Sequence, residues 1–326
     1  MTNEELMTLN YIKDNIDSME PSIPIVIPSY KNRPGNIVQN LECLSNNDIY
    51  VFVYEDDYLA SAYNQYDNKP NVHFVKIQAE WRSIQRKRHF IQKYFLERPE
   101  IHDYIMIDDD VTDSKMWTID KVKHNHLPLI NFFGAFEYAH KSLGDKRTYS
   151  CTAASDLEFG HYDFKEFMKI HGQLHQVFAI SNDFVKSSGI MFRDAENISE
   201  DVLLTADLMK AGYDTNTFSW MQYMLTHNMD LKYSLASTMD KQHLYVINTL
   251  SILRENARPF FMDSNNTFGT KATMKPNKDW YLMQPIVDDK NKTHKEKFDE
   301  LLVLLKKLKN KESDDERPSE LEGFFE

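Results

Sequence analysis

The segment Tyr104-Ile105-Met106-Ile107-Asp108-Asp109-Asp110 decides how this chain folds. Four apolar or aromatic residues in a row are typical of a short buried strand, and three carboxylates follow them directly. Similar runs, bounded by polar residues, lie at positions 23–29, 49–54, 72–77 and 177–180. We therefore expect five strands at 23–29, 49–54, 72–77, 104–107 and 177–180.

Helical patterns separate the first four of these strands. After Asn36, apolar residues follow helical spacing to residue 44, and residues 81–96 carry a second apolar helical face. Strand and helix alternate at intervals of roughly 25 residues, which predicts a parallel sheet with right-handed crossovers. The predicted fold class is α/β, a Rossmann-like, mostly parallel sheet with flanking helices. Ligands of such sheets bind at the carboxyl ends of the strands.

The second half of the chain is less regular. Residues 127–172 mix aromatic residues, glycine and charge, and we expect loops with short elements there. A helix is predicted over 202–211, because Ser199 can cap it, Glu200 and Asp201 suit its positive end, and Gly212 can end it. Further helices are predicted over 240–255 and 295–309, so the C-terminal part should be helical.

Composition narrows the class of protein. The chain has 326 residues, of which 41% are hydrophobic, enough for one large domain or two smaller ones. Its two cysteines, Cys43 and Cys151, argue against a disulfide framework or a cysteine metal site. The polar N-terminus and the short apolar runs predict neither a secretory signal nor a membrane segment, and hence a cytoplasmic protein. The formal charge of −12 excludes a global attraction to nucleic acid, although local basic patches can still bind it.

The acidic triplet Asp108-Asp109-Asp110 is the strongest chemical signal. Three adjacent carboxylates repel one another and are stabilised by a cation. A hard divalent ion such as Mn²⁺ or Mg²⁺, with phosphate oxygens completing its shell, suits them. The alternative is an acidic turn that merely ends the strand.

Two other strand ends carry polar side chains. Pro28-Ser29-Tyr30-Lys31-Asn32-Arg33 follows the first strand, and its aromatic and cationic groups can stack a base and hold phosphate. Glu55-Asp56-Asp57 follows the second strand and offers acceptors for a base edge or ribose hydroxyls. Each loop alone could be ordinary surface, but with the acidic triplet the two predict one crevice.

Together these segments carry a family resemblance. The order Ile25-Val26-Ile27-Pro28-Ser29-Tyr30, Val53-Tyr54-Glu55-Asp56 and Ile105-Met106-Ile107-Asp108-Asp109-Asp110 resembles the nucleotide-sugar half of GT-A glycosyltransferases. The resemblance covers residues 23–111 and extends more loosely to residue 212. It implies a GT-A fold, a UDP-sugar donor and a divalent metal, Mn²⁺ or Mg²⁺, held by a DxD-type motif. Implied donor-binding residues are Pro28, Ser29, Tyr30, Arg33, Glu55, Asp108 and Asp109.

The first motif, with its Pro-Ser-Tyr, also resembles phage DNA-modifying members of the family, notably the TET-associated glycosyltransferases of hydroxymethylated cytosine. This implies transfer of a sugar to hydroxymethylcytosine, or its glycosylated form, in phage DNA, in the host cytoplasm. The alternative acceptors are a glycan, a lipid-linked saccharide or a protein hydroxyl. No obligate protein partner is implied.

The resemblance also assigns catalytic and metal-binding residues. GT-A enzymes often carry a Glu-Asp pair before a helix, and Glu200-Asp201 matches it, with Asp201 preferred as the base that takes the acceptor proton. Acidic residues also suit any first helical turn, which is the structural alternative. The implied metal ligands are Asp108, Asp110 and a histidine, His227 or alternatively His243.

Basic residues mark the predicted helix 81–96. Arg82, Arg86, His89 and Lys93 recur at helical spacing, with Lys87 and Arg88 on neighbouring faces. In the resembled family a basic residue of this helix reaches the diphosphate, which Arg82 or Arg88 could do. If the acceptor is DNA, we expect phosphate contacts from Arg86, Lys93, Lys271 and Lys275. The alternative is a solvated helix face.

Two other classes of protein remain as alternatives. A nucleotidyltransferase would carry a glycine-rich phosphate loop, whereas residues 28–34 contain no glycine. A non-catalytic nucleic-acid-binding module would be basic overall. For the glycosyltransferase we expect an N-terminal helix or arm (1–20), a nucleotide-sugar-binding half (21–115), an acceptor-binding half (116–260), a C-terminal extension (261–311) and a disordered acidic tail (312–326).

Overall fold

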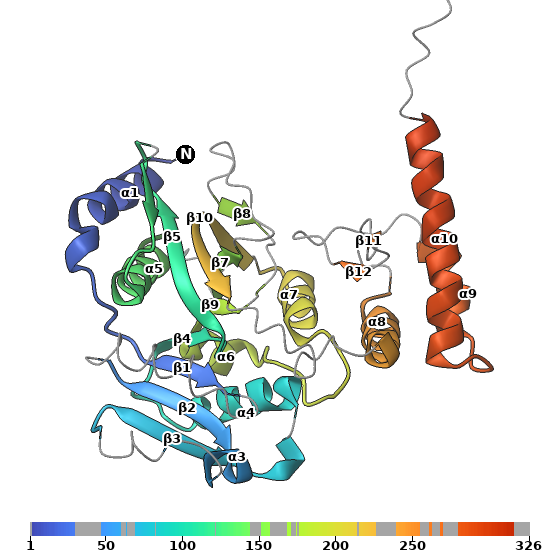
Figure 1. Cartoon of the computed structure of the whole chain (residues 1–326), viewed down its shortest axis with the longest axis horizontal. Coiled ribbons are helices and arrows are strands. Elements are labelled where there is room, and N and C mark those ends of the chain that lie inside the picture. The colour runs from blue at the N-terminus through green and yellow to red at the C-terminus, as the bar shows by residue number, and fades with distance from the viewer. Residues whose placement is uncertain are drawn as a thin grey trace, which may run out of the picture. The chain divides into compact units, whose positions relative to one another are not determined.

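The computed structural model of the chain describes residues 2–29, 47–59, 63, 69–81, 83–120, 122–143, 151–156, 168–170, 174, 176–213, 215–225, 239–254, 261–262, 268–269 and 280–315. The chain divides into two compact units, Met1–Ser234 and Leu235–Glu326. The first unit contains the sheet, including the ends of β1 (Ile25–Pro28), β2 (Ile49–Tyr54) and β4 (Asp103–Ile107) (Figure 1). The helix predicted after Asn36 lies outside the described residues.

One large sheet runs through the first unit, with the strand order β3-β2-β1-β4-β9-β7-β10-β5-β6 and with β8 paired to β10. Its strands β1 (Ile25–Pro28), β2 (Ile49–Tyr54), β3 (Val72–Ile77) and β4 (Asp103–Ile107) are parallel. Beyond β4 the sheet is mixed and comprises β9 (Val177–Ser181), β7 (Cys151–Asp156), β10 (Thr215–Leu225), β5 (Val111–Trp117), β6 (Lys123–Asn125) and β8 (Met168–Ile170). The α/β prediction is confirmed, and so are the parallel first four strands.

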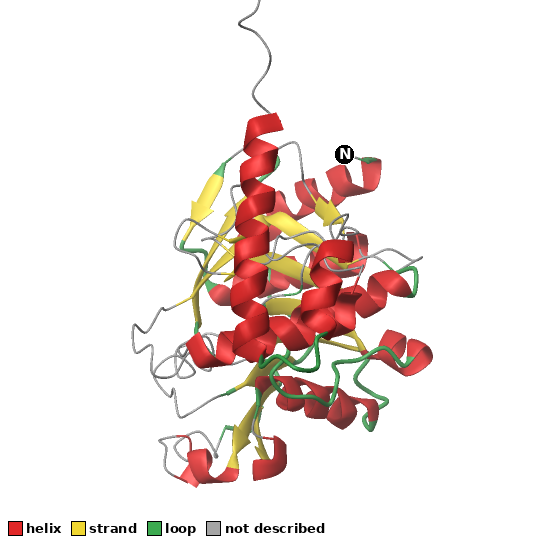
Figure 2. Cartoon of the chain, turned by 90° about the vertical axis from the view of Figure 1, so that its right-hand side faces the viewer, coloured by secondary structure: helices red, strands yellow, loops and turns green. Residues whose placement is uncertain are grey.

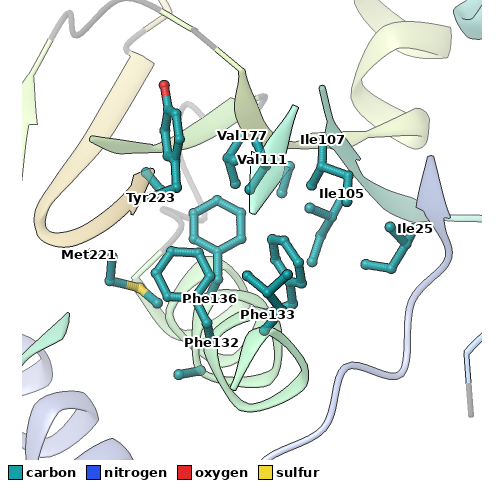
Figure 3. Close-up of a cluster of buried hydrophobic side chains, with 14 of the residues drawn as sticks. Ile25, Ile105, Ile107, Val111, Phe132, Phe133, Phe136, Val177, Met221 and Tyr223 are labelled. Carbon is teal, nitrogen blue, oxygen red and sulfur yellow. The ribbon is translucent and has the colours of Figure 1, made fainter. Parts of the chain in front are cut away.

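The central strands are apolar throughout because both faces of the sheet are covered. Successive side chains of a strand point to opposite faces, so each strand feeds two separate core clusters. One cluster, packed against α1 (Asn3–Asn15) and α5 (Leu129–Leu143), contains Ile25, Ile27, Ile105, Ile107, Val177 and Ala179 (Figure 3). The other, packed against α4 (Ile84–Leu96), α6 (Asn182–Ser188) and α7 (Glu200–Lys210), contains Val26, Tyr104, Met106, Phe178 and Ile180.

Helix α5 corrects the prediction of loops over residues 127–172. Ten of its 15 residues are buried, and Phe132, Phe133 and Phe136 are fully buried (Figure 3). Leu129, Phe132, Phe133 and Phe136 follow the helical spacing i, i+3, i+4 and i+7, although Phe and Gly are modest helix formers. This apolar spacing and burial against the sheet and α1 therefore outweigh the modest helix propensity of the segment.

Helix α5 also anchors the chain just before β1. The Glu137 carboxylate accepts hydrogen bonds from the Ser22 amide (2.5 Å), the Ser22 hydroxyl (2.5 Å) and the Ile23 amide (3.2 Å). The Asn131 side chain donates to the Met19 carbonyl (3.0 Å). These bonds fix where β1 enters the sheet, and hence where its carboxyl end lies.

The second unit is mostly helical, as predicted for the C-terminal part. Helix α8 (Met239–Leu253) packs with α10 (His294–Asp315) and α9 (Trp280–Asp288), and β11 (Phe261–Met262) pairs with β12 (Phe268–Gly269). Helix α10, with 22 residues, is the long red helix of Figure 2. Within the described ranges, no helix is both long and apolar enough to cross a membrane.

Gly134 sits where α5 touches the segment before β1. A Cβ at this position would lie 2.6 Å from both the Glu20 nitrogen and the Met19 carbonyl carbon. Because these are backbone atoms, we expect Gly134→Ala to lower the free energy of unfolding by about 3 kcal/mol in urea denaturation. The exposed change Ser142→Ala on the same helix should alter it by less than about 0.5 kcal/mol. Equal stability of the two variants would contradict the close contact.

Candidate functional site

The carboxyl ends of three adjacent parallel strands meet at one edge of the sheet. Pro28 ends β1, Glu55 follows β2 as the first residue of α3 (Glu55–Leu59), and Asp108 follows β4. Because β1 lies between β2 and β4, the three predicted segments are neighbours. The structure therefore brings the three strand ends together at one edge of the sheet, and the crevice itself remains a prediction. Tyr30 and Arg33 of the first loop lie outside the described residues.

A buried arginine joins the acidic triplet to the predicted acceptor base. Arg88 of α4 donates through Nη2 to Asp108 Oδ1 (2.7 Å) and through Nη1 to Glu200 Oε1 (2.8 Å). The Arg88 side chain is 4% exposed, the Asp108 side chain 22% and the Glu200 side chain 10%. Its guanidinium also lies 5.4 Å from the ring centroid of Phe178. Asp108 of the triplet and Glu200 of the Glu200-Asp201 pair, almost a hundred residues apart in sequence, thus contact the same guanidinium.

One cation shared by two carboxylates leaves an excess of negative charge. Burial disfavours the charged guanidinium, but Asp108 and Glu200 outweigh this effect, so the pKa of Arg88 lies above its ordinary value. Burial raises the pKa of Glu200 to about 7 against the lowering effect of Arg88, and the nearby carboxylates of Asp201 and Asp108 raise it further. Glu200 can therefore gain or lose a proton near neutral pH.

The other acidic residues lie close to this pair in sequence and in the fold. Asp109 is buried and Asp110 half-buried in the turn between β4 and β5, where the Val111 amide donates to the Asp108 carbonyl (3.3 Å). Asp201 is half-buried in the first turn of α7, and its Oδ1 accepts from the Val202 amide (2.8 Å). Ser199 stands at the N-cap position of this helix but makes no side-chain capping bond.

A second buried cation of α4, Lys87, lies at the end of β1. Its ammonium donates to the Ser29 carbonyl and lies 4.1 Å from the ring centroid of Tyr54. The Ser29 hydroxyl is 2.6 Å from that of Tyr63. From the sequence we expected Lys87 on a face next to the basic stripe of this helix, and we assigned no function to it. Here it fixes the chain at the point where the predicted donor loop begins.

A signal for Arg88 was present in the sequence. Ile84, Ile91 and Phe95 form the apolar stripe of α4, and Arg88 stands within that stripe, four residues after Ile84 and three before Ile91. A buried arginine needs anionic partners. Its position in the stripe thus indicates a carboxylate pair, although it does not say which carboxylates.

Of the other basic residues predicted to bind diphosphate or DNA, the structure describes only some. Arg86 forms ion pairs with Asp194 (3.3 Å) and Glu196 (3.2 Å), and Lys93 is exposed, 6.0 Å from the ring centroid of Trp81. Arg82, Lys271 and Lys275 lie outside the described residues. A DNA-binding role for these residues remains a prediction, and the charge of Arg86 is already balanced within the chain.

The candidate metal ligands have the right chemistry for a divalent cation, because Asp108 and Asp110 supply the hard oxygen ligands that Mn²⁺ and Mg²⁺ prefer. Among the described residues, however, no three His, Cys, Asp or Glu side chains converge on a common point. His227 lies outside those residues. The alternative ligand, His243, belongs to the second unit, where its ring packs on Phe298 at 4.6 Å between centroids. The described side chains alone thus provide an incomplete metal site.

Comparison with known proteins gives distant structural matches. No protein-family model and no curated protein matches the chain. Residues 1–349 of S. aureus TarS align with 14% identity and a TM-score of 0.42 over 72% of this chain and 74% of that one. The same protein in complex with UDP-GlcNAc aligns with 13% identity and a TM-score of 0.42 over 64% and 60%.

GalNAc-T7 with UDP, GalNAc and Mn²⁺ aligns with 9% identity and a TM-score of 0.43, over 85% of this chain but about half, 52%, of that one. These neighbours are GT-A type glycosyltransferases. At such identities and scores the likeness assigns neither an activity nor a ligand to this chain. The α/β class rests on the strand order described above.

Glu200 should make stability depend on pH. Its pKa is about 7 in the folded chain against an ordinary 4.5, so its contribution to stability is complete below pH 4.5 and is lost as the pH rises through 7. Relative to Glu200→Gln, the free energy of unfolding of the wild type should fall by about 3 kcal/mol between pH 4.5 and 8. Urea denaturation at several pH values measures this. Glu196→Gln, which removes an exposed carboxylate, should follow the wild-type curve, and a Glu200→Gln curve parallel to both would refute the shift.

Proposed function

We propose that this chain is an enzyme, a glycosyltransferase that moves a sugar from a nucleoside-diphosphate donor, most simply a UDP-sugar, to an acceptor hydroxyl. The observation that carries the proposal is the Arg88 bridge between Asp108, at the carboxyl end of β4, and Glu200, at the start of α7. A group-transfer enzyme must hold its donor and its acceptor base at one place. The bridge supports such an arrangement, because it joins a predicted donor-binding residue, Asp108, to a predicted acceptor-side residue, Glu200.

The donor is proposed to bind along the ends of β1, β2 and β4. Ser29 and Glu55 would contact the nucleoside, and Asp108 and Asp109 the diphosphate region, as the sequence resemblance implies. Arg88 adds a buried positive charge beside Asp108, which offsets the repulsion between carboxylates and phosphates. A divalent cation held by Asp108 and Asp110 would neutralise the diphosphate leaving group.

On the acceptor side, Glu200 and Asp201 provide the proposed base. A carboxylate there takes the proton of the acceptor hydroxyl, the hydroxyl oxygen bonds to the anomeric carbon, and the bond from that carbon to the diphosphate breaks. Glu200 is held by Arg88, whereas Asp201 is half-buried beside it. We therefore keep Asp201 as the base. Glu200 is then a neighbouring group whose charge changes near neutral pH.

Calorimetric titration with UDP tests the donor site. We expect binding that strengthens at least about tenfold when Mn²⁺ is added, and we expect Asp110→Asn to lose this gain, because a ligand of the ion is removed. Asp120→Asn is a matched control, since Asp120 is exposed and pairs with Lys13 at a distance of 2.8 Å in a different part of the first unit.

UDP binding that is equal with and without Mn²⁺ would remove the metal from the proposal while leaving the donor site. A complete lack of UDP binding, with other nucleoside diphosphates also inactive, would refute the donor site itself.

For the acceptor we propose hydroxymethylcytosine in DNA, or its glycosylated form, on the strength of the sequence resemblance to phage DNA-modifying enzymes. The described surface narrows how DNA would be held. Arg86 is engaged by two carboxylates, whereas Lys93, two turns further along α4, is exposed. Lys93 is thus the better described candidate for a phosphate contact, and a glycan, lipid-linked saccharide or protein remains the alternative acceptor.

Incubation with UDP-sugars and either hydroxymethylated or plain DNA, followed by nucleoside mass spectrometry, should give a sugar adduct on the hydroxymethylated DNA. Lys93→Met should make the logarithmic salt dependence of DNA affinity shallower by about 0.9, the value for one phosphate contact. Arg86→Met should leave that slope unchanged, because its charge is balanced by Asp194 and Glu196. Transfer to a saccharide or peptide, with none to either DNA, would replace the DNA acceptor by its alternative.

A further inference from the structure

A segment without helix or strand leads to the proposed base. Residues 190–199, here named the strap, connect α6, whose C-cap is Gly189, to Glu200 at the start of α7. The strap contains a residue with positive φ, Asn197, and a short turn closed by the Ala195 amide and the Arg193 carbonyl (2.9 Å). Irregular backbone of this kind is not positioned by a strand ladder or by helical hydrogen bonds.

Polar side chains of α4 supply the missing hydrogen bonds. Gln92 Oε1 accepts from the Phe192 amide (2.6 Å), and His89 Nδ1 lies 2.5 Å from the Phe192 carbonyl, to which it can donate. Gln85 Nε2 donates to the Ile198 carbonyl (3.0 Å). These bonds reach backbone atoms at both ends of the strap, so they fix the path of the chain whatever its side chains are.

The three polar residues lie on one face of α4 together with Arg88. Gln85, Arg88, His89 and Gln92 are spaced i, i+3, i+4 and i+7, the spacing of neighbours along a helix. Arg88 contacts Glu200, the residue directly after the strap. The strap therefore runs antiparallel to α4, from Gln92 at its beginning to Gln85 and Arg88 at its end.

Burial makes these contacts strong anchors. Gln85 and Gln92 are each 1% exposed, so water does not replace their hydrogen bonds when the chain fluctuates. The Phe192 side chain is fully buried against Phe178 of β9, 6.0 Å between ring centroids, which adds an apolar anchor at the same point. The strap is also joined to α7, because Arg193 donates two hydrogen bonds of 3.0 and 2.7 Å to the Asp207 carboxylate.

We propose that Gln85, His89 and Gln92 are positioning residues, which hold the strap so that Glu200 and Asp201 face the donor bound at Asp108. The inference rests on the proposed transferase function. A base displaced by about 1 Å loses much of its effect, while donor binding, which uses other strand ends, does not change. The residues thus act on the transfer step through the backbone of the strap and touch neither substrate.

Two measurements on the whole 326-residue chain test the role. Gln92→Met keeps the length of the side chain but removes the acceptor for the Phe192 amide. Hydrogen–deuterium exchange of peptides covering 189–201 should then become about tenfold faster or more. The kcat should fall about tenfold while the KM for the UDP-sugar stays within about twofold. Gln92→Glu, which keeps the accepting oxygen, should restore slow exchange.

Gln284→Met in α9 is the matched control, because Gln284 bonds to exposed Asp288 in the second unit and should change neither exchange nor kcat. If Gln92→Met does not fold, Gln85→Met tests the other end of the strap by the same criteria. Unchanged exchange, or faster exchange without a fall in kcat, would overturn the positioning role. Wild-type protein that binds no UDP would instead overturn the proposed function, independently of the exchange result.

Discussion

The arrangement of this molecule depends on one buried guanidinium. Arg88 brings together two carboxylates from opposite halves of the first unit, and its positive charge stabilises the buried Glu200 carboxylate and the half-buried Asp108 carboxylate. Its own position is set by α4, which is held against the sheet by Ile91 and Phe95 in the core. The ion pairs therefore hold the start of α7 at a defined position relative to the sheet. Charge and packing act here as one constraint, because moving the helix would break the bridge.

Much of the first half of the chain could be predicted because its local signals agree with its global fold. Residues 49–54 and 72–77 are strands with the predicted bounds, and the strand ending at Ile107 places the acidic triplet at the predicted edge. Helix α5 was missed although its apolar residues follow helical spacing. Phe132, Phe133 and Phe136 lie on one side of the helix, but Asn131, Glu137 and His140 are buried as well, and polar residues of this kind in the sequence suggest loops.

The candidate site residues could be selected one by one from the sequence, but their contacts could not. Carboxylates after a strand and before a helix can be identified from the sequence, since their chemistry and their positions are local properties. That Arg88 would join Asp108 to Glu200, or that Gln92 would bind the Phe192 backbone, depends on how α4 is rotated about its axis. Such rotation is fixed by packing between segments about a hundred residues apart, which no local pattern records.

The two core clusters on opposite faces of the sheet have a consequence for how this sequence can vary. The cluster around α5 is separated from the candidate site residues by the strands of the sheet. Apolar substitutions in this cluster should therefore change the stability of the fold and leave the chemistry of the site intact. Helix α4 has no such freedom: one side forms core, Lys87 reaches the end of β1, and the polar face holds Arg88 and the strap. In a set of diverged sequences, the apolar positions of α5 should exchange one apolar residue for another, whereas its Gly134 and Glu137, like the polar face of α4, should change slowly.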